Sequence, residues 1–485
     1  MRSASSRSTE LVLGRLPPAA AAVLRAVRRA GGRAAGLVLV GGAVRDALLG
    51  RPVTDLDVAL PTGALALAER VAASLGATAV VLDAERGAAR VAGPGLQLDI
   101  NDFRAPDLAG DLAARDFTVN ALAVPLAPLL TAGRAPIVDP TGGRDDLRAR
   151  RLRPAGPGVL ADDPLRALRA VRLEATLGLT LTPAGARAVR AVAPALARVS
   201  AERVRDEVVA LLTLPATGRA LRRADRLGVL EAVLPEVAPM RRSPQPAPHR
   251  FDVLEHSLRA VEACDRLLAT LDALEPFGEE LAAHVDERLG GALDRRRVLK
   301  LAALLHDVSK PETRQVVDGH VHFYQHDVIG ARRARAIGDR LRLPERATAV
   351  LERLVRHHLR PMHLGQAGEV TRRARYRFYR DLGPDTRDLL LLSLVDAAAV
   401  IGVTPLAIWR RAGLVRDLMT GWAEAESVAA APPLVRGEDV MARFALPPGP
   451  VIGDLLAKAR EAQDLGVVRT REEALAYLDS LGGGP

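Results

Sequence analysis

The sequence contains a single cysteine among its 485 residues, and aromatic residues make up only 3%. The lone thiol, Cys264, excludes a disulfide framework and a zinc site built from thiolates, which favours a reducing compartment such as the cytoplasm. The scarcity of aromatic rings leaves no evident platform on which nucleic-acid bases would stack. Charged residues interrupt the N-terminal stretch, so the apolar core of a signal peptide is missing.

Long apolar runs are missing as well. The most apolar segment, residues 389–403, is too short to cross a bilayer and carries Asp396 near its middle. It predicts a buried helix with one functional acid, and no membrane partner is expected.

Positive charge is in excess, because 68 Lys and Arg residues face 58 Asp and Glu residues. The resulting net charge of +10 favours a polyanionic partner such as RNA, although it says nothing about the fold. No obligate protein partner is indicated.

The most informative stretch is residues 37–60. Its pattern predicts a strand over 37–40, a turn at Gly41 and Gly42, a helix over 43–49 and a strand over 54–60. Side chains alternate along a strand, so Asp55 and Asp57 are expected on one face, where two carboxylates suit Mg²⁺.

The glycine pair lies close to these acids in the sequence. Without Cβ atoms, the amides of Gly41 and Gly42 can approach a phosphate, and the following helix, which carries Arg45, offers its positive dipole end. A phosphate-binding turn beside paired carboxylates is typical of phosphoryl transfer. Either feature alone is more often a plain turn or a solvated strand face.

This stretch resembles the nucleotidyltransferase superfamily, and specifically its class II, the bacterial tRNA nucleotidyltransferases (CCA-adding) and poly(A) polymerases. The resemblance covers roughly residues 35–480 and implies an α/β, polymerase-beta-like head with a small mixed sheet, followed by an all-α neck and body and an all-α HD domain. The domains predicted are an N-terminal helix and tail (1–30, with 1–16 frayed), the head (31–155), the neck and body (156–245), the HD domain (246–402) and a helical C-terminal tail (403–485).

Two further head segments fit the resemblance. In the segment 96–104, Asp99 takes the place of the family's third catalytic carboxylate, although an exposed strand acid is an equally good interpretation. The segment 114–121 resembles the family's second motif. There Arg115 can donate to phosphate, and Asp116 and Asn120 can bind the ribose of the incoming nucleotide.

The chain departs from the family pattern after Arg104. Only 10 residues separate Arg104 from Arg115, where the family usually carries a flexible loop of a couple of dozen residues. Members that add only the two cytidines are similar in lacking that loop, so this feature favours cytidine addition.

The segment 162–172 is expected to select the base. Asp163 and Arg166 are predicted to lie on one face of a helix, where a carboxylate and a guanidinium can pair with the amine and ring nitrogen of cytosine or adenine. Arg169 is assigned to the same nucleotide-binding set. Ordinary helix capping explains the same charge order.

The second constellation contains histidines and resembles the HD metal-dependent phosphohydrolases. His256, the adjacent His306 and Asp307, and Asp396 match the order of the HD ligands. Imidazole with carboxylate suits Mn²⁺, Ni²⁺ or another divalent transition metal better than Mg²⁺, and His326 and His358 extend the site to a second metal or to phosphate.

These observations predict a template-independent enzyme that adds C and/or A from CTP and ATP to the 3′ end of tRNA. Asp55 and Asp57 would hold two Mg²⁺ ions, with Asp99 as the third catalytic acid. The alternatives are a poly(A) polymerase acting on general RNA, and an HD phosphohydrolase whose head merely binds RNA.

Overall fold

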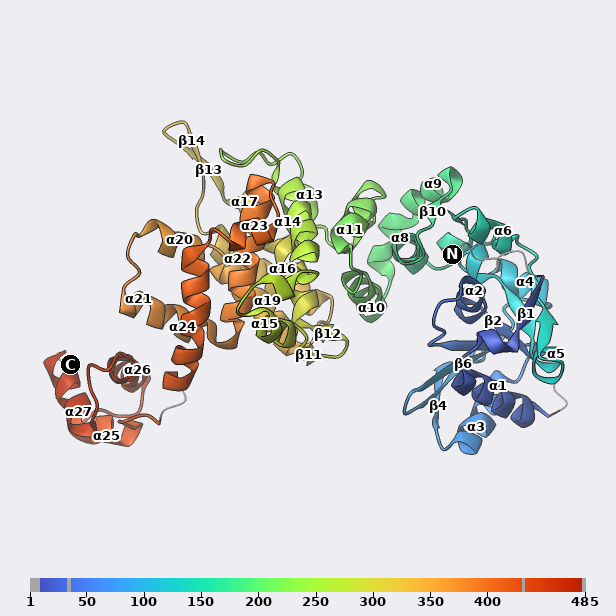
Figure 1. Cartoon of the computed structure of the whole chain (residues 1–485), viewed down its shortest axis with the longest axis horizontal. Coiled ribbons are helices and arrows are strands. Elements are labelled where there is room, and N and C mark those ends of the chain that lie inside the picture. The colour runs from blue at the N-terminus through green and yellow to red at the C-terminus, as the bar shows by residue number, and fades with distance from the viewer. Residues whose placement is uncertain (1–8, 33–35, 430–431, 482–485) are drawn as a thin grey trace. The chain divides into compact units, whose positions relative to one another are not determined.

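The computed structural model describes residues 9–32, 36–429 and 432–481. The chain forms two compact units, one made of residues 1–207 with 223–233 and the other of 208–222 with 234–485 (Figure 1). Within the described ranges, no helix has both the length and the apolar character that crossing a bilayer requires.

The first unit contains a six-stranded mixed sheet. Its strand order is β4-β5-β6-β3-β2-β7, in which β3 and β6 are parallel and all other neighbours are antiparallel. The small mixed sheet predicted for the head is therefore confirmed. The strands are β2 (Val38–Val40), β3 (Leu56–Leu60), β4 (Thr78–Asp83), β5 (Ala88–Gly93), β6 (Leu96–Asp102) and β7 (Ala123–Pro125).

Short helices pack around this sheet. Leu112 of α4 packs with Val38, Val40 and Ala59 of the central strands, so apolar contacts fix the ends of the strands that carry the acids. The helices are α1 (Pro18–Gly31), α2 (Gly42–Leu49), α3 (Ala64–Leu75), α4 (Leu108–Ala113), α5 (Leu126–Thr131) and α6 (Gly143–Arg148).

Two details of the head differ from the sequence prediction. Strand β3 begins at Leu56, so Asp55 lies just before the strand and is exposed. The predicted tail is wrong for residues 10–12, because β1 (Glu10–Val12) pairs with β8 (Arg134–Pro136). A pairing between segments this far apart in the sequence leaves no local pattern. Residues 1–8 of that predicted tail lie outside the described residues.

Helices follow the sheet in the first unit. Strand β9 (Arg151–Leu152) pairs in parallel with β10 (Thr180–Leu181) and fixes the start of this region. The helices are α7 (Val159–Asp162), α8 (Leu165–Leu177), α9 (Pro183–Val192) and α12 (Val229–Val233). Helices α10 (Ala201–Leu212) and α11 (Thr217–Arg226) each have residues in both units.

The second unit is built on three helices that pack against one another, α14 (Val253–Leu268), α16 (Arg295–Leu305) and α22 (Thr386–Ile401). The predicted buried helix around Asp396 is α22. Two hairpins interrupt the helices, β11 (Arg288–Gly290) with β12 (Leu293–Asp294) and β13 (Arg314–Val317) with β14 (His320–Phe323). The other helices are α13 (Val237–Met240), α15 (Gly278–Val285), α17 (Lys310–Thr313), α18 (His326–Arg340), α19 (Glu345–His357), α20 (Arg360–Gln366), α21 (Arg372–Leu382), α23 (Pro405–Trp409) and α24 (Gly413–Ala429).

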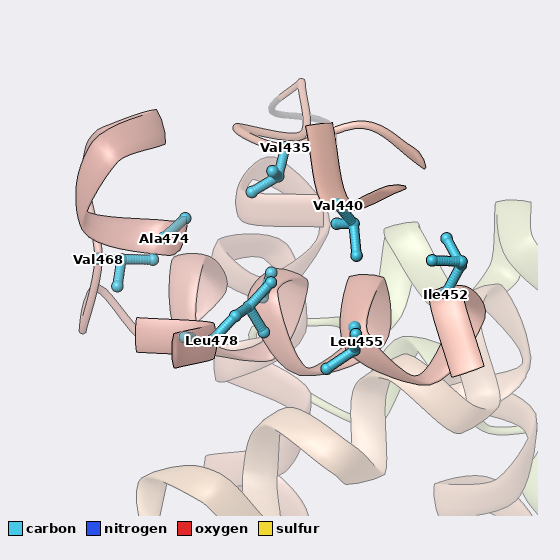
Figure 2. Close-up of a cluster of buried hydrophobic side chains, with 9 residues drawn as sticks. Val435, Val440, Ile452, Leu455, Val468, Ala474 and Leu478 are labelled. Carbon is cyan, nitrogen blue, oxygen red and sulfur yellow. The ribbon is translucent and has the colours of Figure 1, made fainter. Parts of the chain in front are cut away.

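The C-terminal part of this unit has an apolar core of its own. Helices α25 (Gly437–Phe444), α26 (Pro450–Asp464) and α27 (Arg471–Ser480) surround it, and Figure 2 shows Val440, Leu455 and Leu478 pointing toward one another. These three helices lie within the predicted helical C-terminal tail.

Candidate functional site

A cleft of about 1470 Å³ opens in the first unit where the sheet meets α8. The cleft brings together every residue that the sequence predicted for catalysis or nucleotide binding in the head and neck. The predicted residues that line the cleft are Gly41, Gly42, Arg45, Asp55, Asp57, Asp99, Arg115, Asp116, Asn120, Asp163, Arg166 and Arg169.

Steric crowding explains why glycine occupies position 41. Gly41 has a φ of +75°, and a Cβ on it would lie 3.1 Å from Oδ2 of Asp57 and 3.5 Å from Nη1 of Arg115. Any larger residue would be strained and would crowd the acid, whereas glycine leaves the backbone open beside the N-terminus of α2. The N–H of Gly41 donates to the carbonyl of Leu122 over 3.1 Å, so this amide is already paired. An anion reaching the turn meets the N-terminus of α2, which begins at Gly42, and the positive end of its dipole.

The acids lie side by side at the edge of the cleft. Asp57 on β3 is directly opposite Asp99 on β6, so their side chains share one face of the sheet. The pKa of Asp57 is raised to about 6, mainly by burial and also by the nearby Asp99 and Asp55, against the lowering effect of Arg115 and Arg169. A divalent cation would relieve this accumulation of negative charge, and an all-carboxylate donor set fits Mg²⁺.

A hydrogen-bond network fixes the residues predicted to meet the ribose. Asn120 donates to Asp116 over 3.1 Å, and Arg169 pairs with the other oxygen of Asp116 at 3.2 Å. Burial would raise the pKa of Asp116, but Arg169 and Asn120 hold it below its usual value. Arg45 in turn donates to Asn120 and pairs with Asp46. Asp116 is therefore an ionised acceptor held in one orientation.

The short segment between Arg104 and Arg115 is folded and anchored. Its fully buried Asp111 accepts hydrogen bonds from the Arg115 guanidinium, at 3.0 and 3.1 Å, and from the backbone N–H of Arg104 at 3.1 Å. Burial and the neighbouring Arg115 lower the pKa of Arg104. Asp111 thus fixes the guanidinium of Arg115 and the backbone of Arg104, and both arginines line the cleft.

The predicted helical placement of Asp163 is wrong. Asp163 lies between α7 and α8 with extended backbone angles, and α8 begins only after Pro164. Its carboxylate nevertheless lies 4.0 Å from Nε of Arg166 and accepts a hydrogen bond from Arg203 over 2.8 Å. The carboxylate and guanidinium remain neighbours, although not as an i,i+3 pair of one helix.

The second unit gathers the predicted HD residues. Nε2 of His256 lies 3.1 Å from Nε2 of His306 and 3.1 Å from Oδ1 of Asp396. Asp307 lies between this group and a second one, because its Oδ2 lies 3.2 Å from Nε2 of His306 while its Oδ1 lies 3.5 Å from Nε2 of both His326 and His358. The described residues therefore offer two adjacent groups able to hold a metal, His256 with His306 and Asp396, and Asp307 with His326 and His358.

Ring orientation supports metal binding in this cluster. His306, His326 and His358 each direct Nδ1 at a backbone carbonyl three residues earlier, 2.7 to 3.0 Å away. Donation from Nδ1 leaves the Nε2 lone pairs pointing inward, and facing lone pairs repel unless a cation lies between them. Burial, the largest influence, lowers the pKa of His326 to about 4, so this ring is a neutral ligand near pH 7.

Family models match three parts of the chain. The poly(A) polymerase head domain matches residues 37–107 and 98–153, the probable RNA and SrmB-binding site of polymerase A matches 178–241, and the HD domain matches 253–400. A relative from Deinococcus radiodurans, an A-adding tRNA nucleotidyltransferase, is 38% identical over 91% of this chain and 95% of its own length. The chain belongs to the bacterial tRNA nucleotidyltransferase and poly(A) polymerase family.

Other relatives bear different names within the same family. The CC-adding tRNA nucleotidyltransferase of Thermus thermophilus is 35% identical over 90% of this chain and 92% of its own. The CC-adding enzyme of Geobacter sulfurreducens is 31% identical, over 91% of both chains. A solved CCA-adding enzyme in complex with ATP has a TM-score of 0.63 at 20% identity, over 98% of this chain and all of that one, which shows the shared fold.

The structure also identifies contacts that the sequence did not predict. Arg90 pairs with Asp99, Arg203 pairs with Asp163, and Glu207 accepts from both Arg169 and Arg172. In the HD cluster, Lys310 lies 2.7 Å from Asp307. Alternation along residues 88–93 places Arg90 on one face of a strand, but only the strand register shows which acid it faces.

Burial of Asp57 predicts a pH-dependent Mg²⁺ affinity. Below the Asp57 pKa of about 6 in the metal-free protein, the cation must displace a proton from this carboxyl. Mg²⁺ affinity is therefore expected to fall about tenfold per pH unit below that value and to level off above it. Calorimetric titration of the His306→Ala/His358→Ala protein, in which each of the two HD groups has lost a histidine, measures this dependence. An affinity that stays constant through that range would contradict it.

Proposed function

We propose that the chain adds C and/or A from CTP and ATP to the 3′ end of tRNA, without a nucleic-acid template, in the cytoplasm. The observation that carries this proposal is the convergence of Asp55 and Asp57 with the Gly41 turn in one cleft. Family membership, the tRNA-specific names of the relatives and the positive net charge support RNA as the partner.

Each wall of the cleft has a role in this reaction. Two Mg²⁺ ions held by Asp55 and Asp57 would neutralise the triphosphate and promote ionisation of the RNA 3′ hydroxyl. The N-terminus of α2 at Gly42 would face the phosphates beside the Gly41 turn, and Arg45 braces Asn120 next to it. Asp116 accepts from the ribose, and Asp163 with Arg166 faces the base.

The anchored segment supports cytidine as the nucleotide added. Nη1 of Arg166 donates to the carbonyls of Ala114, 3.2 Å away, and Val159, 2.9 Å away, and Ala114 is the last residue of the short segment. The base-facing guanidinium is therefore tied to a segment that Asp111 holds in place. A guanidinium held in one position favours recognition of a single base, whereas an enzyme that adds C and then A must change its recognition between the two.

Extension of defined RNAs with single nucleotides tests both levels of this proposal. A tRNA lacking its CCA end is expected to gain two nucleotides with CTP alone and none with ATP alone. If the protein extends only tRNA that already ends in CC, and does so with ATP, it adds A and the proposed cytidine specificity is wrong. Long tails from ATP on general RNA would indicate a poly(A) polymerase, and no incorporation at all would refute the transferase proposal.

We also propose that the HD cluster of the second unit hydrolyses phosphate esters. The inward lone pairs of His306, His326 and His358 support divalent metal ions there, of the transition series because imidazole dominates the donor set. Bound metal would polarise a phosphate and supply hydroxide. Lys310, beside Asp307, is placed to neutralise the phosphate charge.

Loss of one histidine ring is expected to disrupt this cluster. His306→Ala removes the Nε2 that faces both His256 and Asp307, so bound Mn²⁺ or Ni²⁺ should fall by about one ion per chain. Metal analysis after dialysis, together with an assay of 2′,3′-cyclic phosphate and phosphomonoester hydrolysis, measures both consequences. The exposed His320→Ala is the matched control. Equal metal content and activity in both variants would refute the HD proposal.

A further inference from the structure

Three charged side chains form a row across neighbouring strands at the edge of the head cleft. Asp57 on β3 is opposite Asp99 on β6, and Asp99 is opposite Arg90 on β5. Residues paired in register point to the same face of a sheet and lie one strand spacing apart. The two acids and the arginine are therefore direct neighbours in the order Asp57, Asp99, Arg90.

Arg90 binds both oxygens of Asp99. Its Nε lies 2.7 Å from Oδ1 and its Nη2 lies 2.9 Å from Oδ2, which is the two-pronged geometry that holds a carboxylate most firmly. By contrast, no described residue donates a hydrogen bond to the Asp57 carboxylate. Of these two neighbouring acids, only Asp57 has its oxygens available.

The pair also changes the charge of the row. Asp99 is neutralised by Arg90 and half of its coordinating lone pairs are directed at the guanidinium, so a cation gains less by approaching it. Asp55 and Asp57 have no arginine bound in this way, and they lie where the glycine turn meets the cleft.

We infer that Arg90 withholds Asp99 from the metal ions of the head, which are held by Asp55 and Asp57. This inference rests on the proposed transferase function for the presence of the ions. It assigns Arg90 as a residue that acts on the metal site through Asp99, and it gives Asp99, the predicted third catalytic acid, no contact with the ions.

Metal binding in a double-mutant cycle tests the inference apart from catalysis. In the His306→Ala/His358→Ala protein with CTP, in which both HD groups have lost a histidine, Mn²⁺ affinity is measured for Arg90→Gln, Asp99→Asn and the combination. Arg90→Gln releases a third carboxylate and is expected to tighten Mn²⁺ binding about tenfold, while Asp99→Asn weakens it by no more than about threefold. In the Asp99→Asn background, Arg90→Gln should have no further effect, because no carboxylate remains to be released.

Two other patterns would overturn the inference. Loss of Mn²⁺ affinity in Asp99→Asn as large as in Asp57→Asn would make Asp99 a ligand. Tightening by Arg90→Gln that persists without Asp99 would show a general charge effect. Arg90→Lys, which keeps the charge but only one prong, should restore most of the wild-type affinity. The control Arg70→Gln removes an exposed arginine bonded only to the carbonyl of Ala30 and should change nothing. If the Mn²⁺ affinities follow the expected pattern but the protein does not extend tRNA, the proposed transferase function is refuted and the inference about Arg90 stands.

Discussion

Replacing Asp57 with asparagine is expected to reduce nucleotide addition by about a thousandfold or more, because the amide removes a charged ligand from the point where the triphosphate is neutralised. The fold should not suffer. Burial raises the pKa of Asp57 to about 6, which means that its charge is unfavourable in the metal-free protein. The neutral asparagine is therefore expected to leave the melting temperature unchanged or slightly higher while tRNA extension is lost.

The matched control is Asp145→Asn. Asp145 is an exposed acid of α6 that pairs with Arg148 at 2.8 Å, and surface pairs of this kind contribute little. Its variant should extend tRNA at the wild-type rate. Comparable activity of the Asp57 and Asp145 variants would remove Asp57 from the reaction, and a large drop in the melting temperature of Asp57→Asn would assign it a structural role instead.

Local patterns predicted the centre of the head well. The glycine pair, the helix over 43–49 and the strand before Leu60 depend on neighbours in the sequence, and the structure reproduces them within two residues. The predicted helical placement of Asp163 is wrong, although the sequence contains a local signal against it. Asp163 precedes Pro164, and the residue before a proline is kept out of the helical region by the proline ring. The carboxylate of Asp163 still lies near the guanidinium of Arg166, because the backbone turns between the two residues.

Contacts between distant segments were beyond local patterns. The pairing of Arg90 with Asp99 depends on the register of two strands, and the position of β1 depends on β8. The order of the HD residues predicted which side chains gather, since helices α14, α16 and α22 each contribute one part. It did not predict that Asp307 itself bridges the two groups, because its contacts with His326 and His358 depend on how segments distant in the sequence pack.

The largest expected effect on stability belongs to Arg295, at the start of α16. This side chain is 1% exposed, and its Nη1 lies 2.7 Å from Asp385 and 2.6 Å from Asp388, both equally buried. Arg295→Met keeps the volume but leaves these carboxylates short of positive charge. Breaking a buried ion pair on one side costs about 3–5 kcal/mol, so the unfolding free energy of the second unit is expected to fall by that amount.

Chemical denaturation followed by circular dichroism measures this loss of unfolding free energy. Arg332→Met, at an exposed position of α18, is the control and should cost little. A deficit below about 1 kcal/mol for Arg295→Met would show that His284, which pairs with Asp388, and Arg353, which pairs with Asp385, compensate for Arg295.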